Sequence, residues 1–206
     1  MTRSLAVVAG AALALPSTAS AAELVVSPQK RCYSSGESVN LLGTGFSPLG
    51  SATVTRDGSV LGALNTDSNG AFNGILTLAQ NSGKQTKTYT ATDGTDSTLT
   101  ASAQITVSSV RVNLAPATGA PGRTLTLTAR GFTTGRTLWA HIKRGRSTRN
   151  VKIGRLKGAC GNLKARRRLL PRNAALGVHT IQFDTFRRYN PNQRIRDRYT
   201  ITVTRG

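Results

Sequence analysis

The chain has 206 residues and a formal net charge of +20 at pH 7, and only 5% of its residues are aromatic. This length allows one large domain or two small ones. Beyond the N-terminus, no stretch is apolar for the roughly 20 residues that a membrane-spanning helix needs. The two Cys and two His residues lack the spacing of a zinc site.

The first 21 residues have the three-part layout of a secretory signal peptide. Met1–Arg3 is a short positive start, an apolar run extends from Leu5 to Leu15, and Ala19-Ser-Ala21 is a small-residue cleavage site. The apolar run is too short to cross a bilayer as a helix. The sequence therefore predicts cleavage after Ala21 and a secreted chain that lies outside the cell or at its envelope. A retained N-terminal anchor is the alternative.

Residues 22–108 are expected to form a first β domain. Alternating runs are separated by turn residues, and Asp57-Gly58 between two runs is a strong hairpin signal because both positions tolerate a positive φ. No helical period is present. The expected strands are 23–27, 38–42, 52–56, 60–64, 71–78, 86–92 and 102–107. Seven short strands at this spacing predict a sandwich of the immunoglobulin (Ig) type.

Residues 109–206 repeat this plan as a second, basic domain. Gly36 and Gly45-Phe46 match Gly122 and Gly131-Phe132. The expected strands are 110–114, 125–129, 138–143, 150–156, 163–170, 179–185 and 199–204. The predicted fold class is therefore all-β, with two tandem Ig-like antiparallel β-sandwiches after the signal peptide. Ser108-Ser109 is the only spacer, so the two domains should lie close together.

The repeated plan resembles that of secreted Ig-like modules common in actinobacteria, and it is similar to the sandwich of the enediyne apoproteins. The resemblance covers nearly all of the mature chain and is carried by Ser27-Pro28, Gly36, Gly45-Phe46, Asp67, Gly70 and Ile105–Val107, and in the second copy by Pro116, Gly122, Gly131-Phe132 and Ile201–Val203. These are structural glycines and core positions, so the resemblance implies a fold and no activity. The enediyne carriers place two short disulfides within one domain. This chain has one Cys per domain, so chromophore binding is not carried over.

Cys32 and Cys160 are the only cysteines, and an even count in an exported chain favours a disulfide. One cysteine lies in each domain, so the bridge would fix the domains to each other. Two buried or free thiols are one alternative. Another is a cell-wall cysteine enzyme that uses Cys160 as nucleophile with His141 or His179 as its base. A transpeptidase cysteine is expected in a His-Gly-Cys run or a Thr-Leu-x-Thr-Cys strand, and the residues Gly158-Ala-Cys-Gly-Asn162 match neither pattern.

No other set of residues predicts catalysis or a cofactor. The chain lacks Gly-x-Ser-x-Gly, and the only acidic residues near either histidine are Asp184 and Asp197. Asp67-Ser-Asn-Gly70 matches part of a calcium loop, but no Glu follows at the closing position, which favours a tight turn. We therefore expect a protein that is not an enzyme and binds neither a metal ion nor another cofactor.

Trp139 lies in an alternating strand that has two possible outer faces. Leu138, Ala140 and Ile142 share one face, and Trp139, His141 and Lys143 share the other. If the second face were exposed, Trp139 and His141 would form a sugar-stacking strip, and the chain would be a carbohydrate-binding module. A Trp on the third strand of an Ig-like sandwich usually fills the core, and this interpretation is favoured.

The excess of positive charge lies in the second domain, which holds 22 of the 28 Lys and Arg residues and two acidic residues. Such a field attracts polyanions, and arginine forks suit phosphate and carboxylate groups. The candidate anion-binding residues form three runs: Lys143, Arg144 and Arg146; Lys164, Arg166 and Arg168; Arg187 and Arg188. The alternative is that each run is a solvated strand edge that discourages aggregation.

The sequence thus predicts a secreted or cell-envelope, non-enzymatic binding or structural protein. Its cationic second domain would contact an anionic cell-wall or extracellular polymer. Nucleic acid is a less favoured ligand, because Tyr189 beside two arginines is a single aromatic and a stacking groove needs several. The sequence leaves the oligomeric state open.

Overall fold

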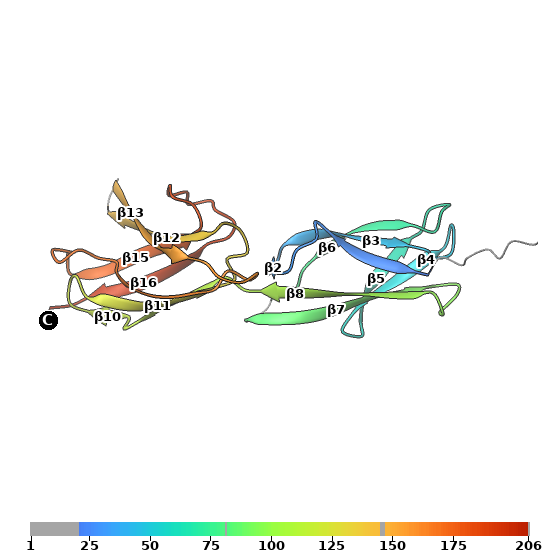
Figure 1. The fold of residues 1–206 in the computed structure, drawn as a ribbon, viewed down its shortest axis with the longest axis horizontal. Coiled ribbons are helices and arrows are strands. Elements are labelled where there is room, and N and C mark those ends of the chain that lie inside the picture. Colours follow the sequence, from blue (N-terminus) through green and yellow to red (C-terminus); the bar gives the residue numbers. More distant parts are fainter. Residues whose placement is uncertain (1–20, 81, 145–146, 206) are drawn as a thin grey trace, which may run out of the picture.

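The computed structural model describes residues 21–80, 82–144 and 147–205. The expected signal peptide lies outside the described residues except for Ala21. The regular secondary structure of the described residues is β-strand throughout, as the sequence predicts (Figure 1). The strands of the N-terminal half are β1 (Glu23–Ser27), β2 (Tyr33–Ser34), β3 (Ser38–Thr44), β4 (Ser51–Arg56), β5 (Ser59–Asn65), β6 (Phe72–Thr77), β7 (Lys84–Asp93) and β8 (Thr100–Ser108).

The C-terminal half contains a second set of strands in the same order. They are β9 (Arg111–Ala115), β10 (Thr118–Gly119), β11 (Thr124–Arg130), β12 (Thr137–Arg144), β13 (Ser147–Arg155), β14 (Leu163–Arg168), β15 (Gly177–Asp184) and β16 (Asp197–Val203). The expected strands lie within a few residues of these bounds. The two-residue strands β2 and β10 were not predicted, because so short a run has no periodicity to detect.

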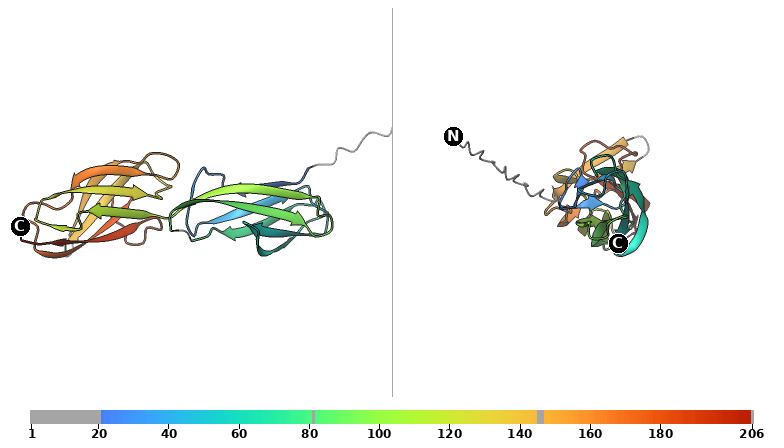
Figure 2. Two further views of the ribbon diagram at one scale, coloured as in Figure 1. Left: turned by 90° about the horizontal axis from the view of Figure 1, so that it is seen from below. Right: turned by 90° about the vertical axis from the view of Figure 1, so that its right-hand side faces the viewer.

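Each half is a sandwich of a three-stranded and a five-stranded sheet. The first half pairs β1-β3-β6 and β2-β8-β7-β4-β5, and the second pairs β9-β11-β14 and β10-β16-β15-β12-β13. Pairing is antiparallel except at β2–β8 and β10–β16. The fold class is therefore all-β with two Ig-like sandwiches, and Figures 1 and 2 show them end to end in an elongated molecule.

Each sandwich has its own hydrophobic core, built from the inward residues of alternating strands. Tyr89, Leu41 and Ile105 are among the fully buried side chains of the first core. Leu138, Ala140 and Phe183 have no exposed surface in the second. Burial of such side chains is the main stabilising term for domains of this size. Two separate cores mean that each sandwich packs around its own interior.

A glycine closes the Gly-Phe corner in each sandwich. A Cβ at Gly70 would lie 1.9 Å from the carbonyl oxygen of Phe46, and a Cβ at Gly161 would lie 1.8 Å from that of Phe132. Both glycines also have a positive φ, of 71° and 58°. No side chain fits such a contact, so these positions require glycine. Gly161 of the second sandwich is therefore equivalent to Gly70 of the first, a match that the sequences of the two halves did not reveal.

Candidate functional site

Basic side chains gather along one edge of the second sandwich, where β13 and β14 are the outermost strands of their sheets. Leu163 and Ala165 pack against the core, so the alternate residues of β14 point outward. Outward side chains on one strand repeat about every 7 Å. We call this edge of the sandwich the basic edge; its exposed cations are Arg149, Lys152 and Arg155 of β13 and Lys164, Arg166, Arg167 and Arg168 of β14. Lys164, Arg166 and Arg168 lie on the outer face of the three-stranded sheet and Lys152 on that of the five-stranded sheet, so the cations lie on both sides of this edge.

The two acidic residues of the second sandwich are engaged elsewhere. Asp197 accepts the backbone N–H of Val112 at 2.6 Å and that of Arg198 at 2.9 Å. Asp184 is fully buried beside His141. Among the described residues, neither carboxylate forms an ion pair with a lysine or arginine. The charge of the basic edge is therefore not neutralised within the described chain.

The other predicted anion-binding residues lie apart from the basic edge. Lys143 is exposed on the outer face of the five-stranded sheet, and the loop 185–196 with exposed Arg187 and Arg188 crosses that same face. Arg144 ends β12, and Arg146 lies outside the described residues. The structure thus brings Lys164, Arg166 and Arg168 together on one strand, but it does not unite the three runs in one face.

A buried polar cluster under the 185–196 loop is centred on His141. Its Nδ1 lies 2.8 Å from Oδ1 of Asn150, and its Nε2 lies 3.1 Å from Oδ1 of Asp184. Gln182 donates to the other oxygen of Asp184 and to the carbonyl oxygen of Asn190, each at 2.8 Å. The ring of Tyr189 covers the histidine with its centroid 5.9 Å away. The cluster therefore fastens the basic loop to the sheet.

Both ring nitrogens of His141 face oxygen acceptors, which suits the doubly protonated imidazolium. Burial acts to lower the pKa of His141, but the hydrogen bonds with Asp184 and Asn150 and the charge of Asp184 outweigh it, so the pKa is raised. Burial likewise acts to raise the pKa of Asp184, but hydrogen bonds from His141, Gln182 and the Phe186 N–H leave it lowered. The two shifts favour a charged, mutually neutralising pair.

Asp184 ends β15 at the place where Asp93 ends β7. Asp93 accepts backbone N–H groups of Thr95, Asp96 and Ser47 at 2.6–2.9 Å, and these bonds lower its pKa to about 2. Asp184 keeps the equivalent bond, from the N–H of Phe186 at 2.8 Å, and uses its remaining acceptors for side chains. Asp93 thus stabilises a backbone turn in the first sandwich, whereas the equivalent Asp184 also holds the side chains of His141 and Gln182 in the second.

Trp139 does not fill the core, so the favoured interpretation of the sequence was wrong. Leu138 and Ala140 point inward with no exposed surface, whereas Trp139 is half-buried on the outer face. Its strand neighbour His141 is only 1% exposed and fully hydrogen-bonded. The sugar-stacking strip of the alternative interpretation would therefore lack its histidine, and the carbohydrate hypothesis loses half of its basis.

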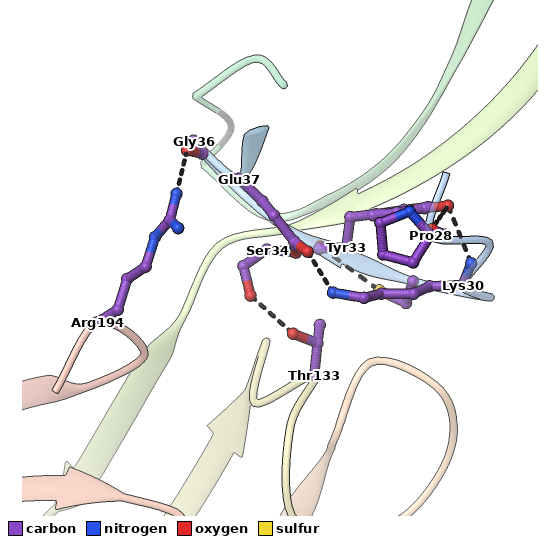
Figure 3. A network of polar contacts seen from close by, with 9 residues as sticks. Pro28, Lys30, Tyr33, Ser34, Gly36, Glu37, Thr133 and Arg194 are labelled. Carbon is purple, nitrogen blue, oxygen red and sulfur yellow. Dashed lines mark hydrogen bonds and ion pairs between the residues drawn. The ribbon is translucent and has the colours of Figure 1, made fainter. Parts of the chain in front are cut away.

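Covalent and polar contacts fix the junction between the sandwiches, and Figure 3 shows its polar contacts. Cys32 and Cys160 form the disulfide that the sequence predicts, with their Cα atoms 5.3 Å apart. Ser34 and Thr133 share a 2.7 Å hydrogen bond through their hydroxyl groups. Arg194 donates to the carbonyl oxygen of Gly36 at 3.4 Å (Figure 3). These contacts hold the two sandwiches to each other at several points.

A local network supports the first-sandwich side of this junction. Lys30 pairs with Glu37, whose other oxygen accepts the N–H of Ser34 at 3.0 Å. The hydroxyl of Tyr33 donates to the carbonyl oxygen of Pro28 at 3.0 Å. Figure 3 shows these side chains around the segment that carries Cys32. The bridge is thus attached to a segment with fixed backbone geometry.

The disulfide overturns the hypothesis that Cys160 is a nucleophile. A bridged sulfur has no thiolate to attack a substrate. His141 is buried with Asp184 and Asn150, and Nε2 of His179 is hydrogen-bonded to the carbonyl oxygen of Ala175 at 2.8 Å. Neither histidine is therefore paired with a nucleophile in the described structure.

The described residues provide neither a cluster of metal ligands nor a membrane-spanning helix. No group of three or more His, Cys, Asp or Glu side chains is placed to hold a metal ion. None of these residues forms a helix with the length and apolar character needed to span a bilayer.

No family model and no curated protein matches the chain. Solved structures that resemble it include the ectodomain of a teleost fish polymeric Ig receptor, at 12% identity and a TM-score of 0.34, covering 89% of this chain and 98% of that one. A putative membrane-anchored protein from Corynebacterium diphtheriae shows 10% identity and a TM-score of 0.37, covering 90% and 57%. The human OSCAR ligand-binding domain shows 13% identity and a TM-score of 0.36, covering 91% of this chain and 100% of that one. Likenesses this distant carry no argument about function.

Proposed function

We propose that the protein is a secreted, non-enzymatic binding protein of the cell envelope, whose basic edge binds an anionic wall or extracellular polymer. The observation that carries this proposal is the basic edge itself. Seven exposed cations lie on two neighbouring edge strands, and both aspartates of that sandwich are occupied elsewhere. A field of one sign along one edge raises the local concentration and association rate of a polyanion.

The chemistry of the cations fits phosphate and carboxylate groups. Most of them are arginines, whose planar forks bind such groups with two parallel hydrogen bonds. Edge strands also present their side chains without a covering layer, so an extended polymer has access along the full length of β14. The disulfide and hydrogen bonds at the junction also support a role for the first sandwich as a spacer that holds the basic edge in a fixed orientation.

The test is retention of the purified mature chain on immobilised polyphosphate and polygalacturonate over a salt gradient. The variant Arg166→Glu/Arg168→Glu reverses two charges of the basic edge, and Arg187→Glu/Arg188→Glu makes the same change in net charge on the loop. We expect the first variant to elute at much lower salt, with the slope of log binding constant against log salt reduced by about two.

The loop variant serves as the charge-matched control and should elute close to the native chain. Equal losses in both variants would show that only net charge matters and would refute a defined basic edge. Retention of the native chain on neither polymer would refute polyanion binding.

A further inference from the structure

The edge of the first sandwich that corresponds to the basic edge carries no charge. There β5 and β6 are the outermost strands, as β13 and β14 are in the second sandwich. Neither Ser59–Asn65 nor Phe72–Thr77 contains Lys, Arg, Asp or Glu. Val60 is 70% exposed and Ile75 is 83% exposed. Edge strands of stable monomers are normally protected by charge, proline, a bulge or a covering segment, and this edge has a bulge but no charge and no proline.

The core of the first sandwich is also open at this edge. The β4–β5 pair contains a bulge that leaves Leu61 without a residue opposite it on β4. The β12–β13 pair contains the equivalent bulge at Ile153. Ile153 is completely buried, whereas Leu61 is 41% exposed. Leu61 lines a groove of about 230 Å³ whose floor includes the core residues Leu41 and Val54. The same structural position is closed in one sandwich and unfilled in the other.

We propose that this apolar edge pairs with the same edge of a second copy of the chain, β5 against β5 in antiparallel orientation. A free edge strand presents unpaired N–H and C=O groups that another strand satisfies. A two-fold axis at Gly62 would place Val60 opposite Leu64 of the second copy and Leu61 opposite Ala63. The central pairs are apolar, the outer pair of Ser59 and Asn65 is polar, and none is charged, so the segment is complementary to itself, as a two-fold interface requires.

The distribution of charge favours this occupant. The first half of the mature chain has nearly equal numbers of basic and acidic residues, so two such sandwiches meet without repulsion. The strands run roughly along the long axis of the molecule (Figure 1), so antiparallel pairing directs the two cationic sandwiches away from each other. Their separation then exceeds the screening length of about 8 Å at physiological salt. A parallel arrangement would bring the two cationic sandwiches together.

The test is sedimentation of the mature chain over a range of concentrations. We expect a reversible dimer for the native chain, and Val60→Lys should weaken it by at least about tenfold, because a charge on an edge strand opposes pairing. Lys152 holds the corresponding place beside the bulge of β13. Val178→Lys is the matched control, since Val178 is also 70% exposed but lies on the central strand β15. This variant should dimerise as the native chain does.

A native chain that stays monomeric at all concentrations would refute the proposal, as would a dimer that Val60→Lys leaves intact. Thermal unfolding of both variants checks that the sandwich still folds. The pairing uses uncharged groups, so added salt should not dissociate the dimer, whereas salt releases a bound polyanion. The failure of this proposal is therefore distinguishable from the failure of the proposed function.

Discussion

Replacing both cysteines, in the variant Cys32→Ser/Cys160→Ser, is expected to destabilise the second sandwich without disturbing its core. Neither cysteine belongs to a core cluster. When the second sandwich unfolds alone, the bridge and the folded first sandwich close a loop that runs from the end of β8 to Cys160. For a loop of about 50 residues, the chain-entropy model gives a stabilisation of about 4 kcal/mol. Native bridges typically contribute 2–4 kcal/mol, so we expect a loss of about that size.

Trp139 provides a selective assay for this loss. It is the single tryptophan of the chain and lies on β12, so its fluorescence reports unfolding of the second sandwich. Urea titrations of the oxidised native chain and of the double variant give the two free energies of unfolding. A loss of about 2 kcal/mol also lowers the melting temperature of a domain of this size by roughly 8 °C or more.

The variant Ser34→Ala/Thr133→Ala separates the bridge from the polar contacts at the same junction. It removes the 2.7 Å hydrogen bond between the sandwiches and leaves the disulfide in place. A hydrogen bond of this kind contributes about 1 kcal/mol, so its loss should be clearly smaller than that of the bridge. If the double serine variant lost less than this control, the reasoning from loop closure would be refuted.

Two further predictions concern the second sandwich. The pKa of His141 is raised in the folded chain, so its contribution to stability is complete below about pH 6.5 and is lost as the pH rises through the pKa of the folded state. The pKa of Asp184 is lowered, so the contribution of Asp184 to stability is lost only in acid. The urea midpoint of the native chain should therefore fall as the pH rises above about 6.5, and that of Asp184→Asn should not. If the midpoints of both chains fell in parallel, the pairing of His141 with Asp184 would not be the cause. Gly161→Ala, whose Cβ would lie 1.8 Å from the carbonyl oxygen of Phe132, should cost more than about 1 kcal/mol in urea titrations. Gly158, in the same sandwich, has a positive φ of 68°, and a Cβ there would meet its nearest atom only at 4.0 Å, so Gly158→Ala should cost less. Equal costs would show that φ alone matters.

The strands and their inward faces could be predicted because both follow from a period of two. Alternation predicts that Leu138, Ala140 and Ile142 share one face, and all three are buried. The repeat was visible because turn glycines and the Gly-Phe corner recur at fixed spacing. The Cys32–Cys160 bridge could be predicted because the chain offers no other pair. In each case the signal is local or has a single solution.

The environment of His141 could not be predicted, because it depends on strand register and on a loop. Alternation showed that His141 shares a face with Trp139, but not that the 185–196 loop would cover it. The pairing of β12 with β13 and β15 brings Asn150 and Asp184 to its two ring nitrogens from positions 9 and 43 residues away. No periodicity in one strand contains that information.

The contrast between the two edges bears on why the basic residues are present. If lysine and arginine served only to protect an exposed edge, the same fold would call for them at β5 and β6 as well as at β13 and β14. One chain contains both solutions, and its first sandwich leaves Val60 and Ile75 bare at the place where the second has Lys152 and Arg166. The fold therefore does not require the cations. The two proposals give each edge its own explanation, in which an apolar strand would contact one edge and an anionic polymer the other.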